Sequence, residues 1–550
     1  MFEKRFAHFN FKGDLFGGVT TAIISLPLAL AFGVASGAGA EAGLWGAIMV
    51  GLFAALFGGS NTLISEPTGP MTVIMTAVLT SMMAKYPENG LAMTFTVVMM
   101  AGAFQVLLGT LKLGKYVTLM PYSVISGFMS GIGVILIILQ LAPLLGHSAP
   151  AGGVLGTLSA LPNMLTEIRY SELVLGLLTL AVVIYFPKAY RKYVPAQLVA
   201  LVAVTLVSMV LFDTDSIRRI GEIPTGLPSL ILPQFNAEIF TTMVIDALVL
   251  GTLGCIDTLL TAVIGDSLTR QEHDSDKELR GQGIANMISG LFGGLPGAGA
   301  TMGTVTNIQV GARSPASGIL RALALALVVL LAGGLTEPIP MAVLAGIAVY
   351  VGLNILDWSF IQRAHKISLP GMGIMYGVML LTIFVDLIVA VGLGVFISNI
   401  IIIERLSRQQ ARQVKAISDA DNDLPLTKAE LALLEKADNK VLFFHLSGPM
   451  IFSVSKAISR QHSRISDYEV MILDLTDVPM FDVTVGLALE NAIKDAQDAN
   501  CEVILVCPNK ETYQQLEKFE ILNLIREESR YNSRYDALQA ALVYVMRIVF

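Results

Sequence analysis

Two short polar segments, broken by glycine and proline, interrupt long apolar runs, one in each half of the hydrophobic part of the chain. They are residues 65–70 (SEPTGP) and residues 293–303 (GGLPGAGATMG). An unpaired backbone amide is costly in lipid, so a helix is broken at membrane depth only inside protein or beside a watery cavity. A matched pair of breaks indicates the central site of an inverted-repeat transporter. The half-helices that follow would point their positive amino termini at that site, which favours an anion there.

The composition identifies an integral membrane protein followed by a soluble domain. Of the 550 residues, 54% are hydrophobic and 14% charged, whereas a soluble chain carries about 25% charged residues. Residues 1–404 hold 19 of the 36 Lys and Arg residues, and the much shorter stretch 405–550 holds the rest. No cleavage pattern follows the apolar run that begins at Leu15, so we expect no cleavable signal peptide. The 3 cysteines form neither a disulfide framework nor a metal-ligand pattern.

The distribution of basic residues predicts a cytoplasmic amino terminus. When the apolar runs are threaded in order, most Lys and Arg residues of the loops fall on the side of the amino terminus, and few on the other side. Arg321 starts a span and counts for neither side. The run 369–404 is long enough for two helices, with Asp386 near the turn. Other stretches are too short or too glycine-rich for an ordinary span and suit a core buried in protein; these are 43–58, 284–294 and 340–354.

The composition changes after Ile403. We predict a transmembrane domain over 1–404, a juxtamembrane helix and linker over 405–437, and a small α/β domain over 438–550. Apolar runs that read as strands alternate with helical patterns, which favours a sheet covered by helices. The strands are expected at 441–446, 470–475 and 503–507, and the helices at 454–465, 484–498, 511–525 and 534–548.

Asp257 lies in the otherwise apolar run 243–265. Carboxylates inside membrane helices are rare, costly and usually functional. Thr261 follows one turn later on the same face, so the pair supplies the hard oxygen ligands that small cations prefer. A buried aspartate that is hydrogen-bonded to a neighbouring helix is the alternative. Asp246 and Asp266 flank the run and are expected at its interfacial ends.

Thr68 precedes Gly69 and Pro70 at the start of a helical stretch, in the position of an N-cap. Its hydroxyl and the nearby amides could hold an anion, although simple capping is the commoner role. Thr301, with the amides around Gly299 and Ala300, stands in the equivalent place of the other half. Glu66 is ambiguous and could be a structural partner at the membrane edge.

Neither broken segment contains Lys or Arg. The two half-helix ends together offer about one positive charge, which suits a monovalent anion better than a fully ionised sulfate. An ionised Asp257 would need a cation to neutralise it. Entry of an anion together with a cation is therefore a natural hypothesis, but composition and spacing do not name the anion.

Several motifs resemble the sulfate permease (SulP) family of anion transporters, kin to prestin and pendrin. The opening signature is carried by 13–15, 26–32 and 42–45, and the tenth-helix motif by 296–307 and 311–314; 473–478 and 481–484 resemble the STAS pattern. The resemblance covers essentially the whole chain. It implies a polytopic α-helical protein of about fourteen membrane segments in two inverted repeats of seven, with core and gate domains and a cytoplasmic STAS domain. Thr484 matches a position that is phosphorylated in some soluble STAS proteins, but we expect no phosphorylation here.

Within the family, residues 63–73, 254–260, 266–270 and 297–305 most resemble the sodium-dependent bicarbonate transporters of cyanobacteria. Carried over by position, this resemblance implies bicarbonate near Thr68, Gly299 and Ala300. It implies sodium near a second set of residues, namely Asp257, Thr261, Gly299, Ala300 and Thr301. Many family members have an arginine at the position of Gly303, and sodium would replace its charge here. Ala262 replaces a hydroxyl residue, which puts one minor ligand in doubt.

The leading hypothesis is a sodium:bicarbonate symporter of a bacterial plasma membrane that works by an elevator-like movement of core against gate, with sodium as coupling ion and no other cofactor. The expected partners are the lipid bilayer and a second copy of the chain, in part through the STAS domain, and not nucleic acid. The alternatives are transport or exchange of another anion such as sulfate or a dicarboxylate, an uncoupled anion channel, and a membrane-tethered regulator. No nucleophile–base pair, phosphate loop or metal motif indicates an enzyme. His365 and His445 stand alone in the sequence and are expected to be structural or solvated.

Overall fold

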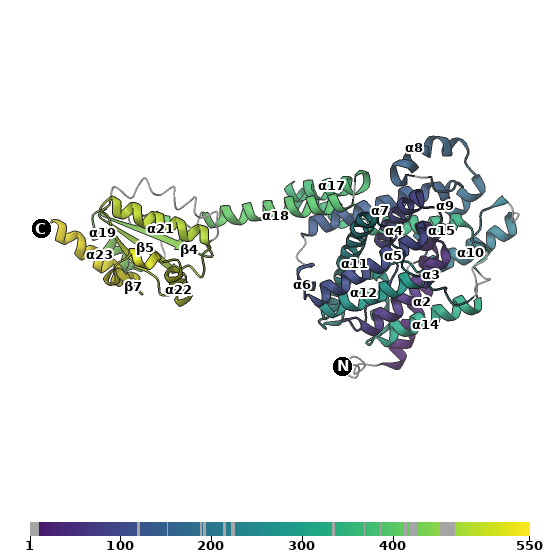
Figure 1. Cartoon of the computed structure of the whole chain (residues 1–550), viewed down its shortest axis with the longest axis horizontal. Coiled ribbons are helices and arrows are strands. Elements are labelled where there is room, and N and C mark those ends of the chain that lie inside the picture. The colour runs from purple at the N-terminus through teal and green to yellow at the C-terminus, as the bar shows by residue number, and fades with distance from the viewer. Residues whose placement is uncertain are drawn as a thin grey trace. The chain divides into compact units, whose positions relative to one another are not determined.

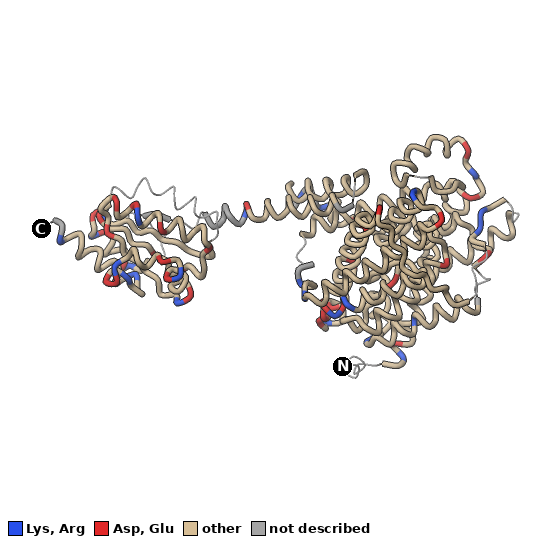
Figure 2. The backbone as a smooth tube through the Cα atoms, in the orientation of Figure 1, with Lys and Arg blue, Asp and Glu red and all other residues tan. Residues whose placement is uncertain are grey.

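The structure is a computed structural model of the 550-residue chain. It describes residues 10–117, 121–150, 152–187, 190, 194–212, 216–221, 226–332, 336–367, 369–385, 387–411, 415–417, 426–450 and 468–549. The chain divides into two compact units, Met1–Ser398 and Asn399–Phe550. Figure 2 shows that charged residues are sparse along the backbone of the first unit and dense along that of the second.

The first unit consists of helices in two successive sets with the same plan (Figure 1). The first set comprises α2 (Phe11–Ser36), α3 (Ala40–Phe57), α4 (Gly69–Lys85), α5 (Gly90–Thr110), α7 (Tyr122–Leu144), α8 (Gly153–Thr166) with α9 (Tyr170–Tyr185), and α10 (Ala196–Leu211). The second comprises α11 (Phe240–Thr269), α12 (Ser275–Leu291), α13 (Thr301–Val310), α14 (Ala316–Ala332), α15 (Met341–Ile355), α17 (Leu369–Phe384) and α18 (Leu387–Ala411), of which the residues up to Ser398 belong to the first unit. Two short helices interrupt the sets: α6 (Gly114–Val117) lies between α5 and α7, and α16 (Trp358–Ile367) lies between α15 and α17.

Packing separates the first four segments of each set from the last three. Helix α12 packs on α3 and α5, α14 packs on α2 and α3, and α11 packs on α5. In the other group, α7 packs on α15 and α17, and α9 packs on α10 and α15, while Gly394 of α18 lies against Val378 of α17. We call these groups the core (α2–α5 and α11–α14) and the gate (α7–α10, α15, α17 and α18). With α8 and α9 counted as one bent segment, the described residues form seven segments twice, as predicted.

Helix lengths follow the prediction in part: 340–354 forms a short helix, α15, whereas 43–58, which we expected to be too short for an ordinary span, lies in α3, and α3 is long enough. Among the described residues, α2, α3, α5, α7 and α11 are long and apolar enough to cross a membrane, and α8 with α9 forms a further candidate bent by 117°. The third segment of each set is short, because a two-residue strand precedes it: β1 (Ser65–Glu66) precedes α4, and β2 (Ala298–Gly299) precedes α13. The run 369–404 forms two helices, α17 and α18; Asp386 lies outside the described residues.

Local sequence signals set the ends of several of these helices. Asn10 caps α2 by accepting a hydrogen bond from the amide of Gly13, and Gly37 ends it with a φ of 79°. Helix α13 ends at Gly311, whose φ of 112° is costly for a residue with a side chain. A turn later the chain enters α14.

The second unit is an α/β domain. Its sheet has the order β3-β4-β5-β6-β7, in which β3 (Lys415–Ile417) is antiparallel to its neighbour and β4 (Val441–Ser447), β5 (Val470–Asp477), β6 (Glu502–Val506) and β7 (Arg530–Tyr531) are parallel. The described helices are α19 (Lys428–Lys436), α21 (Val483–Asp498), α22 (Lys510–Lys518) and α23 (Arg534–Val549), with 3₁₀ turns η4 (Ile521–Leu524) and η5 (Glu527–Ser529). Strand residues alternate between two apolar clusters, so Leu442 packs with α21 and α22 while Phe443 packs with α19 and α23.

The three predicted strands are confirmed to within two residues at each end. The predicted helix over 511–525 is wrong in its second half: Glu520 has a φ of 58°, which ends α22 before the 3₁₀ turn η4. The predicted linker contains a strand that we missed, β3, because three residues carry no readable alternation and the strand exists by pairing with β4. The helix predicted over 454–465 lies outside the described residues.

Candidate functional site

The two broken segments meet in the core and pair as antiparallel strands. Ser65 is opposite Gly299 and Glu66 is opposite Ala298, and the amide of Ala300 donates to the carbonyl of Ile64 over 2.8 Å. The pairing satisfies backbone groups that would otherwise be unpaired at membrane depth. Equivalent segments of two repeats that pair antiparallel are what an inverted repeat requires.

We call the place where the two broken segments pair the crossing. Polar side chains of core helices hold it in place. Asn286 of α12 both accepts from the amide of Gly297 (2.8 Å) and donates to its carbonyl (3.0 Å), which also accepts from Gln282 (2.8 Å). Asn286 donates in addition to Gln105 of α5 over 2.9 Å. Because Asn286 and Gln105 are buried, their hydrogen bonds are made in a low-dielectric setting and fix the approach of the second segment.

The sequence analysis missed the role of Arg321. This residue of α14 is fully buried, and its guanidinium forms an ion pair with Glu66. It also donates to Ser25 (2.9 Å) and to the carbonyl of Ser65 (3.2 Å). Glu66 therefore has a structural partner, as one of our readings expected, and is buried inside the core. The broken segments lack basic residues, yet the fold brings one to them; Glu66 balances its charge.

Two helix amino termini flank the crossing. Helix α4 begins after Thr68, and α13 begins after Ala300. In α4 the amide of Thr72 donates to the carbonyl of Thr68, and in α13 the amide of Thr304 donates to the carbonyl of Ala300, both over 2.9 Å. The amides that precede these bonds have no partner within their helices. They are those of Gly69, Met71, Thr301, Met302 and Gly303. Together with the two helix dipoles, they create a positive potential without a basic side chain.

Asp257 reaches the first of these termini. It lies on α11, is only 8% exposed, and accepts a 2.8 Å hydrogen bond from the hydroxyl of Thr68. Thr68 occupies the N-cap position, but its side chain does not cap α4. Its hydroxyl donates to the carboxylate of Asp257 in this structure, and the expected contact of Thr68 with an anion stays a prediction.

Thr261 reaches the second terminus. Its hydroxyl lies 2.9 Å from the carbonyl oxygen of Gly299 and 3.0 Å from the hydroxyl of Thr301. Thr258, which we had not singled out, accepts from the amide of Gly299 over 3.1 Å. The amides of Gly299 and Ala300 are thus both used inside the protein, so these two residues can offer only carbonyl oxygens to a ligand.

The described residues contain no group of three His, Cys, Asp or Glu side chains that could hold a metal ion. A cation near the crossing would therefore be held by one carboxylate, hydroxyl groups and backbone carbonyls, which are ligands suited to a hard, weakly bound ion. Asp266, at the other end of the run, accepts from or pairs with His273 over 2.6 Å. The carboxylate of Asp266 is therefore engaged with His273 and not with the residues of the crossing.

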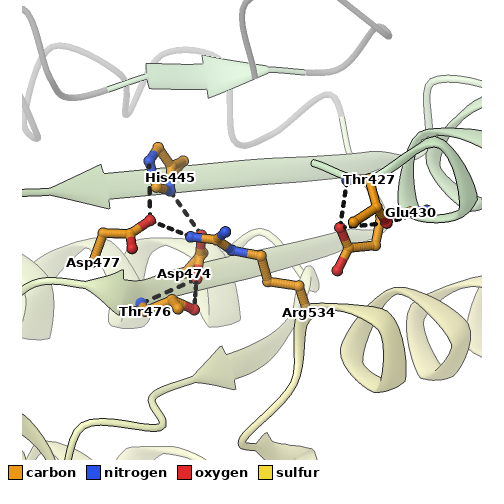
Figure 3. A network of polar contacts seen from close by, with 7 residues as sticks. All are labelled: Thr427, Glu430, His445, Asp474, Thr476, Asp477 and Arg534. Atoms are coloured by element: carbon orange, nitrogen blue, oxygen red, sulfur yellow. Dashed lines mark hydrogen bonds and ion pairs between the residues drawn. The ribbon is translucent and has the colours of Figure 1, made fainter. Parts of the chain in front are cut away.

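The second unit holds a separate polar network (Figure 3). His445 on β4 lies 2.7 Å from the buried Asp474 of β5, and Arg534 of α23 pairs with both Asp474 and Asp477. His445 is therefore a buried structural residue, which is one of the two roles that we expected from the sequence. Burial opposes ionisation of Asp474, but hydrogen bonds from His445 and Thr476 and the charge of Arg534 outweigh it and lower the pKa of Asp474.

Other residues of interest in this unit occupy ordinary positions. Thr484 lies exposed in the first turn of α21, after the N-cap residue Asp482. Its expected lack of phosphorylation stays a prediction. His365 has a side chain outside the described set.

Comparisons with known proteins match both units. The profile of the Sulfate permease family matches residues 11–378, and that of the STAS domain matches residues 434–537. Over 537 residues, 98% of this chain and 95% of the relative, the chain is 58% identical to the Bicarbonate transporter BicA of Synechocystis sp..

Two solved structures are also similar. The transmembrane domain of a cyanobacterium bicarbonate transporter BicA superposes with a TM-score of 0.68 at 61% identity and covers 70% of this chain and 98% of its own. The murine Slc26a9 anion transporter in the inward-facing state gives 0.83 at 20% identity and covers 98% of this chain and 92% of its own. The second likeness concerns the fold alone, and it confirms the predicted architecture over nearly the whole chain.

Proposed function

The chain belongs to the sulfate permease family, and from this premise we propose that it is a sodium-coupled bicarbonate symporter. Its similarity to bicarbonate transporters over almost its full length supports the anion. The observation that carries the coupling is Asp257, a buried carboxylate at the crossing whose neighbour is a hydroxyl and not a basic residue. Arg321 is nearby in the fold but is matched by Glu66.

We place the anion between the amino termini of α4 and α13. Thr68 contributes by positioning Asp257, and the donors are the first-turn amides of the two helices. Gly299 and Ala300 shape the site through the strand pair, since their amides already have partners. A planar monovalent anion fits donors that converge from two helix ends and a total charge of about one.

We place sodium beside Asp257 and Thr261, with the carbonyls of Gly299 and Ala300 and the hydroxyl of Thr301 as further ligands. The hydroxyls of Thr261 and Thr301 lie 3.0 Å apart, so a small ion could replace that contact with two bonds to oxygen. The empty site then carries the negative charge of Asp257, which repels an anion. Bound sodium removes this charge, so each ion favours the binding of the other.

The side chains that hold the crossing in place support our proposal of an elevator-like movement. The side chains that hold β1 and β2 come from α2, α11, α12 and α14 with support from α5, all of them core helices. Gate residues reach the site through apolar side chains: Ile355 of α15 and Leu136 of α7 lie over Gly69. The core can therefore move as one body that carries both ions past the gate.

Uptake of labelled bicarbonate into proteoliposomes, with and without an inward sodium gradient, tests this proposal. We expect uptake to require sodium and to saturate with both ions. Uptake that is indifferent to sodium would reject the coupling. Unlabelled sulfate or a dicarboxylate that competes better than bicarbonate would assign the site to another anion, and a current that does not saturate would indicate a channel.

The remaining parts of the proposal concern surroundings and regulation. We propose that the chain lies in a bacterial plasma membrane with the amino terminus and the STAS domain in the cytoplasm, and that it forms a homodimer in part through that domain. Deletion of residues 438–550 separates transport from regulation: uptake that survives the deletion assigns transport to the first unit. Loss of all uptake in a correctly inserted protein would favour an obligatory role of the STAS domain.

A further inference from the structure

The core meets the gate at two cavities of similar size: one is lined almost throughout by apolar side chains, and the other by apolar side chains together with several that carry hydroxyl groups. One has a volume of about 380 Å³ and is lined on the core side by α4, including Thr76, Ala77, Thr80 and Ser81. The other has a volume of about 430 Å³ and is lined on the core side by α11, from Ile245 to Ile256. We call them the α4 cavity and the α11 cavity.

Both cavities lie on the same side of the site. Helix α4 leads away from Thr68 towards Lys85, and α11 leads from Phe240 towards Asp257. With the amino terminus in the cytoplasm, both stretches belong to the outer half of the membrane. The two cavities are therefore alternative routes by which a solute from outside could approach the crossing.

The α4 cavity is continuous with a line of hydroxyl groups that starts at the site. Thr68, Thr72, Thr76 and Thr80 follow at intervals of four residues, so they share one face of α4. Each of the last three donates to the carbonyl four residues before it, over 2.8 Å. All three donors are used within the protein in this structure, and Thr76 also lies 3.3 Å from the carbonyl oxygen of Ala35. Each hydroxyl can donate to an anion once it rotates away from its carbonyl.

Exposure rises along this line from Thr72 outwards. Thr68 and Thr72 are buried, at 9% and 1%, whereas Thr76 is half-buried and Thr80 is exposed. The barrier at the inner end of the cavity is the first turn of α4, over which Ile355 and Leu136 of the gate lie. By contrast, Thr301 and Met302 at the start of α13 are exposed, so the crossing is closed towards the α4 cavity and open towards α13.

The lining of the α11 cavity contrasts with this. Its residues are Phe128, Ile245, Leu248, Val249, Thr252, Leu253, Ile256, Val391 and Gly392, with Thr252 as the one side chain that carries a polar group. An anion would lose its hydration there without gaining any donor. A hydrocarbon chain of a lipid suits such a surface better.

We infer that bicarbonate enters from outside through the α4 cavity, along the hydroxyl face of Thr80, Thr76 and Thr72, and not through the α11 cavity. This inference deepens the proposed function and rests on it for the identity of the anion. Thr76 is the innermost hydroxyl that the cavity reaches, and it would be the last contact of the anion before the gate opens over Gly69. The four gate residues at the end of α17, Thr382 to Val385, form the opposite wall.

Substituted cysteines test the route. Thr76→Cys, and separately Ala77→Cys as a second variant on the same wall, are exposed in intact cells to an anionic, membrane-impermeant methanethiosulfonate. Thr252→Cys is the matched control in the α11 cavity, and the unsubstituted chain sets the background, since Cys255, Cys501 and Cys507 are all buried. The readouts are the rate of modification, measured by mass spectrometry, and sodium-dependent bicarbonate uptake after modification.

We expect Thr76→Cys and Ala77→Cys to react at least tenfold faster than Thr252→Cys, and modified Thr76→Cys to lose most of its uptake. Equal rates in the two cavities, or no reaction at either α4 position, would overturn the inference. The modification rate does not depend on which ion is carried. Fast modification in a protein that shows no sodium-coupled bicarbonate uptake would therefore refute the proposed function and leave the route intact.

Discussion

Asp257→Asn separates the charge of the site from its shape. Asparagine has the same size and keeps an oxygen that can accept the 2.8 Å hydrogen bond from Thr68. The substitution therefore leaves the contact between α11 and the start of α4 in place. It removes the negative charge that, in our proposal, binds sodium.

The expected magnitude is large. A unit charge pair 4 Å apart at an effective dielectric constant of about 20 gains about 4 kcal/mol. A factor of ten in an equilibrium constant corresponds to about 1.4 kcal/mol, so the sodium affinity should fall by about a hundredfold or more even after a discount for desolvation.

The assay is bicarbonate uptake into proteoliposomes as a function of sodium concentration. Asp266→Asn is the matched control, because Asp266 lies on the same helix and pairs with His273 away from the crossing. We expect Asp257→Asn to show no sodium-dependent uptake and Asp266→Asn to keep the wild-type sodium KM. Wild-type sodium dependence in a well-folded Asp257→Asn protein would refute the assignment of the ion to this carboxylate.

Three further outcomes follow from the structure. Arg321→Met should lower the free energy of unfolding of the first unit by about 3–5 kcal/mol, because it leaves Glu66 buried and unpaired. The double variant Arg321→Met with Glu66→Met should recover most of this loss. If the two substitutions instead give additive losses when unfolding is measured in detergent, the reasoning is contradicted. Asp474→Asn should weaken the hydrogen-exchange protection of β5 by about 3 kcal/mol above pH 4. The difference in protection between the variant and the original chain should shrink as the pH falls through the lowered pKa of Asp474. A difference that grows on acidification would argue against the network. Burial raises the pKa of Cys501 to about 12 and that of Cys507 to about 11, so neither thiol should react with iodoacetamide at pH 8 in the folded protein, whereas reaction within minutes would show that the domain opens.

Much of the architecture was readable from the sequence, because lipid restricts the choices. The breaks at 65–70 and 293–303 could be placed at one site, since broken backbone at membrane depth must be satisfied inside the protein. The strand pair between them was not foreseen, although it is the way in which Ser65 and Gly299 satisfy their backbones. Two-residue strands leave no periodic pattern, and only the fold brings the partners together.

The contacts of individual side chains were harder to predict. Asp257 was singled out because a carboxylate is rare in an apolar helix, whereas only the resemblance to the family implied that it lies near Thr68. Arg321 carried the same kind of signal, a charge in an apolar run. Because it lies near the start of that run, the sequence did not indicate that its side chain is buried. Asn286 and Gln282 were passed over because amides are common at helix surfaces. Only their burial shows that they support the second segment.

The reciprocal flux is the most direct test of the central proposal. If the anion and sodium share the crossing, each must drive the other, because coupling between two bound ligands is mutual. An inward bicarbonate gradient, imposed on proteoliposomes with equal sodium on both sides and the membrane potential clamped, should therefore drive net uptake of labelled sodium. Sodium flux that does not respond to the bicarbonate gradient would contradict the account.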